Sequence, residues 1–176
     1  DFMQQAYLGN HDFWVNDFKN IKVLEVEGGY VQPIGRSFLR AKGRFATVTD
    51  FVYYGLEARP VQTNGTTTII APGIEFSINF LKHFYIRGNV DYNLISGAGT
   101  EAMPVPQLMT NVNFFYHNLL FNDNLEIQAG IDNHFKTDYY APDYRVSTHQ
   151  FFIQDYDNIE GFVISDVYLN IKLGHA

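Results

Sequence analysis

The stretch that decides the fold reads Leu125-Glu126-Ile127-Gln128-Ala129-Gly130-Ile131-Asp132-Asn133-His134. Every second residue from Leu125 to Ile131 is apolar, whereas the residues between them are polar, charged or glycine. A period of two is typical of an extended strand with one apolar face and one polar face. A strand of a soluble sheet alternates in the same way, so the number, length and spacing of such segments decide the fold class.

Composition excludes several classes of protein before any motif is considered. The 176 residues are enough for one domain, and 12 Lys and Arg against 19 Asp and Glu give a formal net charge of −7. This acidic balance gives a nucleic-acid partner no electrostatic basis. The chain has no cysteine, which removes disulfides, thiolate chemistry and cysteine-based zinc sites. No apolar run reaches the roughly 18 residues of a transmembrane helix, so none is expected.

Segments with the same alternation recur along the whole chain. Residues 7–18 mix aromatic residues with turn formers and predict an irregular or partial strand. Strands are expected at residues 21–31, 38–52, 67–80, 84–93, 108–120, 148–156 and 162–175, in addition to 125–134, with 148–156 the least regular. Most of these segments are longer than ordinary soluble strands, and they are long enough to cross a bilayer at a tilt.

The connections between these segments alternate in length. Turn formers predict short connections near Pro33, Lys82, Asp123 and Asn158, and long connections near Gly55, Gly97 and Pro142. An antiparallel meander that carries all its long loops at one end is typical of outer-membrane barrels. We therefore predict an all-β fold, an antiparallel up-and-down transmembrane β-barrel with about eight strands here, which is part of a larger barrel.

The two faces of the expected strands differ in charge, and in the alternating spans of six of them the apolar faces carry no Asp, Glu, Lys or Arg. A membrane barrel turns its apolar face to lipid and its polar face to the lumen. The residues expected to line the lumen are Glu25, Glu27, Arg40, Lys42, Arg44, Glu75, Arg87, Asp91, Glu126, Asp132, His134, Asp166 and Lys172. The residues expected to face lipid are Leu39, Phe45, Ile74, Phe76, Ile78, Ile86, Val90, Val112, Phe114, Leu125, Ile127, Ile131, Val167, Leu169, Ile171 and Leu173.

Two stretches rich in aromatic residues and turn formers flank the strands. The first reads Tyr7-Leu8-Gly9-Asn10-His11-Asp12-Phe13-Trp14, and the second runs from Phe135 through Tyr139-Tyr140-Ala141-Pro142-Asp143-Tyr144 to Phe151-Phe152-Ile153-Gln154. Together with the strands between them, they resemble the putative porin family of the Bacteroidetes outer membrane. In that family a Gly-Asn-His segment with a Trp precedes the last strands, and a Tyr-x-Ala-Pro-x-Tyr loop precedes a Phe-x-x-Gln strand. The resemblance covers nearly the whole chain and implies an outer-membrane location and contact with membrane lipid.

The resemblance also implies a function and a domain organisation. We expect a porin-like passive channel for small polar solutes, formed by residues 1–176 as a single β-barrel domain or as the C-terminal portion of one. Members resemble larger single-chain barrels with an export signal, and many outer-membrane barrels end on an aromatic strand residue. This chain ends Leu173-Gly174-His175-Ala176, so the resemblance implies a fragment that lacks strands at both ends. The alternatives are a non-conducting barrel subunit that binds other outer-membrane proteins and a soluble ligand-binding barrel.

A charged stripe on residues 38–52 invites both a functional and a structural interpretation. Arg40, Lys42 and Arg44 are expected to lie opposite Glu25 and Glu27, for instance Glu27 beside Lys42 and Glu25 beside Arg44. Such residues can form a charged wall that tunes ion selectivity, or a cross-strand ion ladder that is purely structural.

No catalytic, metal or cofactor site is expected. The six histidines lack the spacing of a ligand set, and no Gly-x-Ser-x-Gly motif is present. The one serine close in sequence to a histidine is Ser147, two residues before His149 in an expected loop. We therefore expect no enzyme activity.

Overall fold

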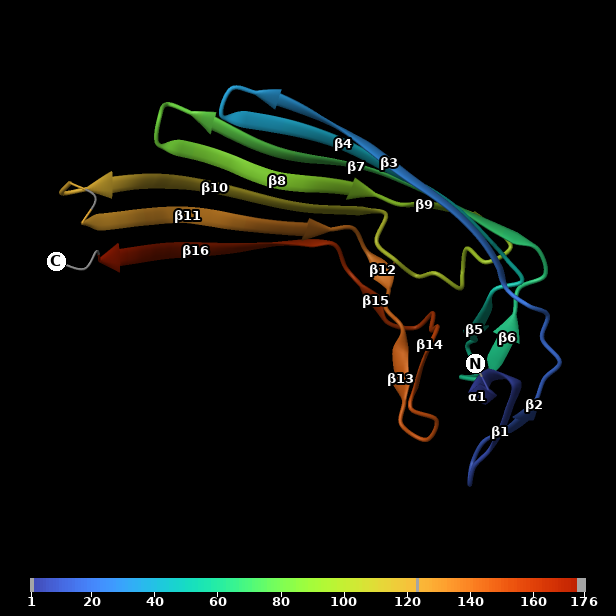
Figure 1. Cartoon of the computed structure of the whole chain (residues 1–176). Helices are drawn as coiled ribbons and strands as arrows, with labels where there is room; N and C mark the ends of the chain where they lie inside the picture. Colours follow the sequence, from blue (N-terminus) through green and yellow to red (C-terminus); the bar gives the residue numbers. More distant parts are fainter. Residues whose placement is uncertain (1, 123, 174–176) are drawn as a thin grey trace.

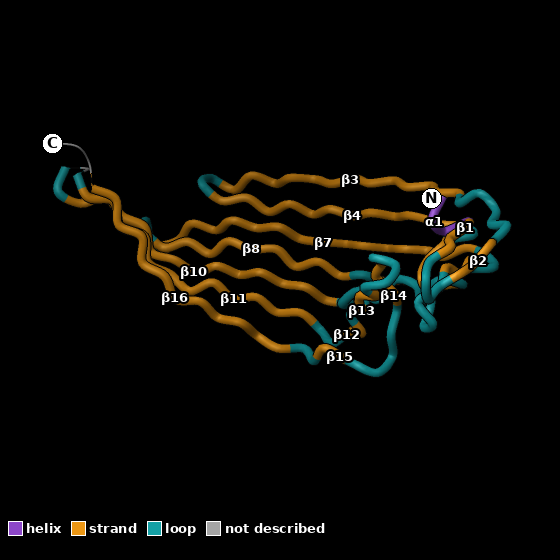
Figure 2. Tube along the Cα trace, turned by 90° about the horizontal axis from the view of Figure 1, so that it is seen from below, coloured by secondary structure: helices purple, strands orange, loops and turns teal. Residues whose placement is uncertain are grey.

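Seven long strands form one curved antiparallel sheet in the computed structural model, which describes residues 2–122 and 124–173 (Figures 1 and 2). Their order across the sheet is β16-β11-β10-β8-β7-β4-β3, and β9 (Leu94–Gly97) pairs with β7 as an eighth strand. The long strands are β3 (Lys22–Ile34), β4 (Ser37–Thr49), β7 (Thr66–Phe80), β8 (Phe84–Tyr92), β10 (Leu108–Leu120), β11 (Leu125–Lys136) and β16 (Phe162–Leu173). The predicted all-β antiparallel meander is confirmed.

The two ends of the sheet differ, as the connection lengths predict. At one end the strands are joined by tight turns, in which Gly35 has φ +62° and Leu81 and Lys82 have φ +47° and +65°. Glycine adopts a positive φ without steric cost, which suits Gly35 to the two-residue turn between β3 and β4. All the long connections lie at the opposite end (Figure 1).

The N-terminal segment and two of the long connections fold into small two-stranded units, whereas residues 98–107 contain no strand. We call residues 2–18, 50–63, 98–107 and 137–161 the loop cap. Its elements are α1 (Phe2–Gln5), β1 (Ala6–Leu8), β2 (Phe13–Val15), β5 (Val52–Tyr54), β6 (Pro60–Gln62), β12 (Tyr139–Tyr140), β13 (Asp143–Arg145), β14 (Gln150–Phe152) and β15 (Asn158–Ile159). The pairs are β1 with β2, β5 with β6, β12 with β15 and β13 with β14. Among the described residues, no helix is long and apolar enough to cross a membrane.

Three sequence predictions about strands need correction or lie outside the description. The strand predicted at 148–156 is wrong, because only Gln150–Phe152 is extended and it pairs with β13 in the loop cap. His149, which precedes it, has φ +54°, and Gln154, which follows it, is held by hydrogen bonds to Ala141 and Asp157, so the segment folds locally. The eighth strand is β9, inside a predicted loop. Residues 174–175 of the predicted last strand lie outside the described residues.

The register of β3 on β4 also differs from the example expected. Glu27 lies opposite Arg44, not Lys42. Pro33 and Ile34 belong to β3 and the turn is Gly35-Arg36, so the turn centre lies one residue later than expected and the register shifts by two residues.

The sheet is open at both edges. Within residues 2–122 and 124–173, β3 pairs only with β4, and β16 pairs only with β11. These seven strands therefore form no closed barrel, and the barrel stays a prediction.

Burial is inverted relative to that of a soluble sheet. All buried residues of the described long strands lie on the polar face: Ala46, Val48, Thr67, Gly73, Ser77 and Phe115. On the apolar face, by contrast, Ile74 is 47% exposed, Ile131 41% and Val167 81%. In a soluble sheet the apolar face would pack against a core.

Candidate functional site: the polar face of the sheet

The strand pairing places the thirteen predicted lumen residues on one face of the sheet. Directly opposite residues of neighbouring strands share a face, and the registers connect Arg40 through Glu75 to Asn89, Asn111 and then His134. Followed across all seven long strands, the registers put the thirteen residues on the same face as this series. The sixteen residues predicted to face lipid occupy the alternate positions along each strand and therefore lie on the opposite face. We call the first set's side the polar face.

Three ion pairs cross the basic strand β4. Arg40 Nη1 lies 3.0 Å from Glu75 Oε2 on β7, directly opposite. Arg44 Nη1 lies 3.8 Å from Glu25 Oε1, which is the expected partner although the register differs. Lys42 Nζ reaches Asp91 Oδ1 at 2.8 Å, two strands away. Of the expected ion ladder to Glu25 and Glu27, only the Arg44–Glu25 pair forms, and Arg40 and Lys42 pair with Glu75 and Asp91 instead. Exposed pairs of this kind each contribute under about 1 kcal/mol.

Glycines in the intervening strands allow contacts between strands that are not neighbours. Gly73 lies between Lys42 and Asp91, and a Cβ there would stand 2.5 Å from Asp91 Oδ1 and 2.6 Å from Lys42 Cε. Gly130 lies in the same way between Tyr168 and Phe115, and a Cβ there would stand 2.8 Å from the Tyr168 hydroxyl oxygen. The bare glycines thus let polar side chains lie flat along the face.

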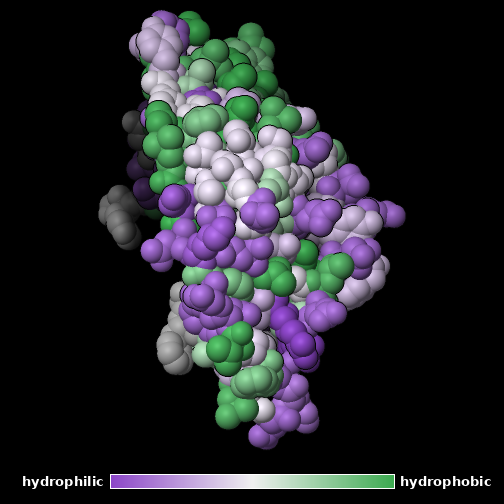
Figure 3. All heavy atoms as spheres, turned by 90° about the vertical axis from the view of Figure 1, so that its right-hand side faces the viewer, coloured by the Kyte–Doolittle hydropathy of each residue, from purple (hydrophilic) through white to green (hydrophobic). Residues whose placement is uncertain are grey.

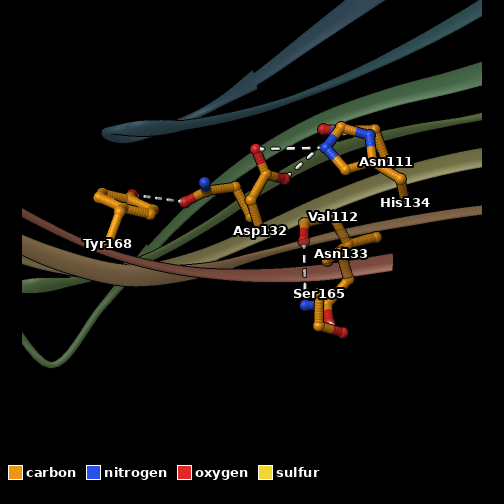
Figure 4. A network of polar contacts seen from close by, with 8 residues as sticks. Asn111, Val112, Asp132, Asn133, His134, Ser165 and Tyr168 are labelled. Carbon is orange, nitrogen blue, oxygen red and sulfur yellow. Dashed lines mark hydrogen bonds and ion pairs between the residues drawn. The ribbon is translucent and has the colours of Figure 1, made fainter. Parts of the chain in front are cut away.

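The acidic part of the polar face centres on Asp132 (Figure 4). Asn111 Nδ2 donates to Asp132 Oδ1 at 3.2 Å, and His134 Nε2 lies 3.6 Å from Asp132 Oδ2. Tyr168 donates its hydroxyl proton to Asn113 Oδ1 at 2.9 Å, across Gly130. In Figure 4, Asn111, Asp132 and His134 lie on one side of the strands, and Val112, Asn133 and Ser165 lie on the other.

Arg87 occupies the middle of the polar face without a carboxylate within ion-pair distance among the described residues. Its Nε donates to Ser77 Oγ at 3.2 Å, and its guanidinium carbon lies 5.1 Å from the Phe115 ring centroid and 5.7 Å from that of Tyr85. The side chain is exposed and borders a hollow of about 580 Å³. A cation held by rings, with its charge uncompensated, can attract an anion or repel a cation.

The residues predicted to line the lumen included only charged residues and His134, although the alternation also places uncharged polar side chains such as Gln128 on this face. Asn89, Asn111, Asn113, Gln128 and Tyr168 all take part in its hydrogen bonds. Their parity within each strand matches that of the charged residues, so the alternation itself was a signal that could have identified them.

Asp12, which is only 4% exposed, connects two units of the loop cap. Arg145 Nη2 donates to Asp12 Oδ1 at 2.9 Å, and Ser147 Oγ donates to Asp12 Oδ2 at 2.7 Å. These bonds connect the β1–β2 unit to the β13–β14 unit. The hydrogen bond from Ser147, followed by the nearby Arg145 charge, lowers the pKa of Asp12 despite its burial.

Aromatic packing completes the loop cap. Trp14 is 6% exposed, stacks on Tyr7 at 4.8 Å between centroids, and meets the edge of Tyr54 at 6.2 Å. Its Nε1 donates to the Met3 carbonyl oxygen at 2.8 Å, and Ile153 N donates to the Tyr54 carbonyl oxygen at 3.0 Å. Figure 3 shows this end of the molecule, where hydrophilic side chains cover much of the surface. The cap is therefore a packed unit whose surface mixes polar side chains with exposed apolar ones such as Leu8, Phe13 and Phe151.

The polar face offers hydrogen-bonding groups and charges of both signs. Within residues 2–122 and 124–173, no group of three His, Cys, Asp or Glu residues could hold a metal ion. The polar face instead presents balanced charges, amides and tyrosines along strands of 9 to 15 residues. Such a face suits the passage or weak binding of polar solutes.

Comparison with known proteins gives one match. A family model described as "Putative porin" matches residues 1–176, the whole chain. No curated protein and no solved structure matches.

Proposed function

The chain belongs to the putative porin family, and from this premise we propose that it is an outer-membrane β-barrel protein that forms a passive channel for small polar solutes. One observation carries the proposal: the polar face holds the buried residues of the long strands, whereas the apolar face is exposed. The apolar face carries no charged residue in the described long strands except Lys22 at the very start of β3. Such a face suits lipid, because a Lys or Arg at the bilayer midplane costs about 2 to 4 kcal/mol, whereas a charge near the interface costs little. The polar face then lines the lumen.

Two further features support a membrane-spanning role. The long strands exceed the 9 to 11 residues that a tilted strand needs to cross a bilayer, apart from β8, which has nine. The tight turns lie at one end and the loop cap lies at the other, which is the arrangement of outer-membrane barrels with periplasmic turns and extracellular loops.

A test of the channel is conductance in planar lipid bilayers, with Arg87→Gln as the informative variant. We expect stepwise conductance from the wild-type protein. Arg87 lacks a carboxylate partner, so its neutralisation shifts the reversal potential in a KCl gradient toward cation selectivity. Arg87→Lys is the control, because it keeps the positive charge and should leave the reversal potential close to that of the wild type. An identical reversal potential in wild type and Arg87→Gln would remove Arg87 from the conduction path.

A non-conducting barrel subunit is the second candidate, and the loop cap is the observation that favours it. The cap lies at the long-connection end of the sheet, and its units are held to one another through Asp12, Trp14 and Tyr54 (Figure 1). A cap that closes the lumen would abolish conductance and leave a surface for another outer-membrane protein. Conductance that appears only after deletion of residues 141–155 would favour this second function.

A further inference from the structure

β3 and β16 are the edge strands of the sheet. On its outer side each has a row of backbone N–H and C=O groups that no strand among the described residues pairs with. Both are long, with 13 and 12 residues, and every residue of β3 is exposed. A long exposed edge is a template for pairing with another strand. Inside a bilayer each unsatisfied backbone group costs several kcal/mol, so a membrane-spanning sheet must pair both edges.

The direction of the strands restricts how the edges can be paired. Each neighbouring pair in the series of seven is antiparallel, so β3 and β16 run in the same direction. Direct closure of β3 onto β16 would need a parallel ladder. Further copies of this sheet inserted in the same orientation would also need a parallel ladder. The β3 of one copy would lie beside the β16 of the next, and these two strands run in the same direction. Antiparallel closure therefore needs an odd number of additional strands.

The charges on the polar face give independent evidence about the residues of the additional strands. The polar face of the sheet carries seven acidic residues, and five of them lie within 4.0 Å of a Lys, Arg or His: Glu25, Glu75, Asp91, Glu126 and Asp132. The other two, Glu27 and Asp166, have no such partner among the described residues. Both lie on edge strands, one on β3 and one on β16.

The neighbours of Glu27 and Asp166 within the sheet leave both carboxylate charges uncompensated. Asp166 lies directly opposite Asp132, and like charges in that arrangement destabilise a sheet. Glu27 lies opposite Arg44, whose guanidinium turns to Glu25 instead. A cation on the next strand would compensate each carboxylate, just as Lys42 compensates Asp91 from two strands away.

Building on the channel proposed above, we propose that an odd number of further antiparallel strands, not drawn from a second copy of these seven, completes the barrel between β16 and β3. The strand beside β3 presents Lys or Arg next to Glu27, and the strand beside β16 presents Lys or Arg next to Asp166. On their other face both strands are apolar, to continue the surface formed by Leu24, Val26, Val167 and Leu169.

Disulfide cross-linking tests directly whether β3 and β16 are neighbours or are separated by additional strands. The introduced cysteines have no competitor, since the chain has no cysteine of its own. In the native protein inserted in membranes, Val26→Cys is combined in turn with Ser165→Cys, Val167→Cys and Leu169→Cys. One intervening strand separates β3 from β16 by about 9.5 Å, beyond the roughly 7 Å between Cα atoms that a disulfide spans. We expect no cross-link in any of the three. The control pair Val26→Cys and Phe45→Cys, which are directly opposite, should cross-link.

Photo-cross-linking identifies the neighbour. Glu27→p-benzoylphenylalanine and Asp166→p-benzoylphenylalanine should each capture a strand outside residues 22–173 that has Lys or Arg on its polar face, as read by mass spectrometry of the joined peptides. A β3–β16 disulfide, a captured peptide from residues 22–34 or 162–173, or a captured strand without a basic residue overturns the inference. Absence of any adduct at both positions, with Phe45→p-benzoylphenylalanine still capturing its neighbours, also overturns it.

Failure of this inference is distinguishable from failure of the channel. A β3–β16 cross-link in membrane-inserted, conducting protein contradicts only the added strands. Protein that stays in the aqueous fraction, with the Val26–Phe45 control intact, contradicts the membrane role itself.

Discussion

Gly73 shows how a residue without a side chain organises the polar face. Lys42 and Asp91 form the shortest ion pair of that face, at 2.8 Å, and they meet over Gly73. An alanine methyl group there would occupy the space of the Lys42 methylenes and the Asp91 carboxylate. Both side chains are flexible at their ends, so we expect them to move apart while the backbone keeps its pairing.

A double-mutant cycle measures how strongly Lys42 and Asp91 interact with and without a side chain at residue 73. Lys42→Met and Asp91→Asn, singly and together, should give a coupling free energy of unfolding under about 1 kcal/mol in the wild-type background. In the Gly73→Ala background the coupling should fall to near zero. Gly43→Ala is the matched control, because a Cβ at Gly43 has nothing within 4 Å. Equal coupling in all three backgrounds would show that Gly73 is dispensable for the contact.

Asp12 makes the loop cap sensitive to acid. Its pKa is lowered below the ordinary value of 3.8, chiefly by the hydrogen bond from Ser147. A group with a lowered pKa in the folded state stabilises that state at pH values above its ordinary pKa, and the contribution is lost as the pH falls through the folded pKa. The connection between β1–β2 and β13–β14 should therefore hold at neutral pH and at pH 5, and weaken below about pH 4.

Hydrogen exchange can follow this change. We expect protection of the amides in residues 143–152, corrected for intrinsic exchange, to drop only below about pH 4. In Asp12→Asn the same amides should exchange faster at pH 7 and show no further step in acid. A wild-type step near pH 6 would contradict the assignment of the change to Asp12.

At the scale of elements, Trp14 is the residue that ties the loop cap together. It contacts Tyr7 and Tyr54 through its ring and Met3 through its indole N–H. Loss of a buried Trp side chain generally costs about 3 to 5 kcal/mol. Trp14→Ala should therefore open the cap to protease between residues 50 and 63 and between 137 and 161, while the seven-stranded sheet stays resistant. Phe13→Ala, at an exposed neighbour, should leave the digestion pattern unchanged.

The elements also show what alternation can predict and what it cannot. The seven long strands were predicted within a few residues, because each has one face of constant polarity and a period of two. Strand β9 and the cap units have two to four residues each, too few for a period to be recognised, and contacts such as that of Ile153 with Tyr54 specify them. The role of Gly73 escaped prediction because alternation treats glycine as neutral. The β3–β4 register depended on a turn whose position differed by one residue.

At the scale of the whole molecule, the two faces of one sheet have opposite relations to their surroundings. The polar face carries the ion pairs, the amide network and the buried residues, and the apolar face is exposed without a packed layer over it. An exposed apolar surface of this extent marks an interaction with another apolar phase. For a member of the putative porin family, we propose that this phase is the outer-membrane lipid, which makes face orientation the central claim.

Environment-sensitive labelling of two adjacent residues of β11 tests that claim most directly. Ile127→Cys and Gln128→Cys point to opposite faces at the same depth, and the chain has no competing cysteine. After labelling with bimane and reconstitution into liposomes, the fluorophore at residue 127 should be quenched by brominated lipid and shielded from aqueous iodide. The fluorophore at residue 128 should be quenched by iodide and not by the lipid. The reverse pattern, or iodide quenching at both positions, would contradict the membrane-spanning account.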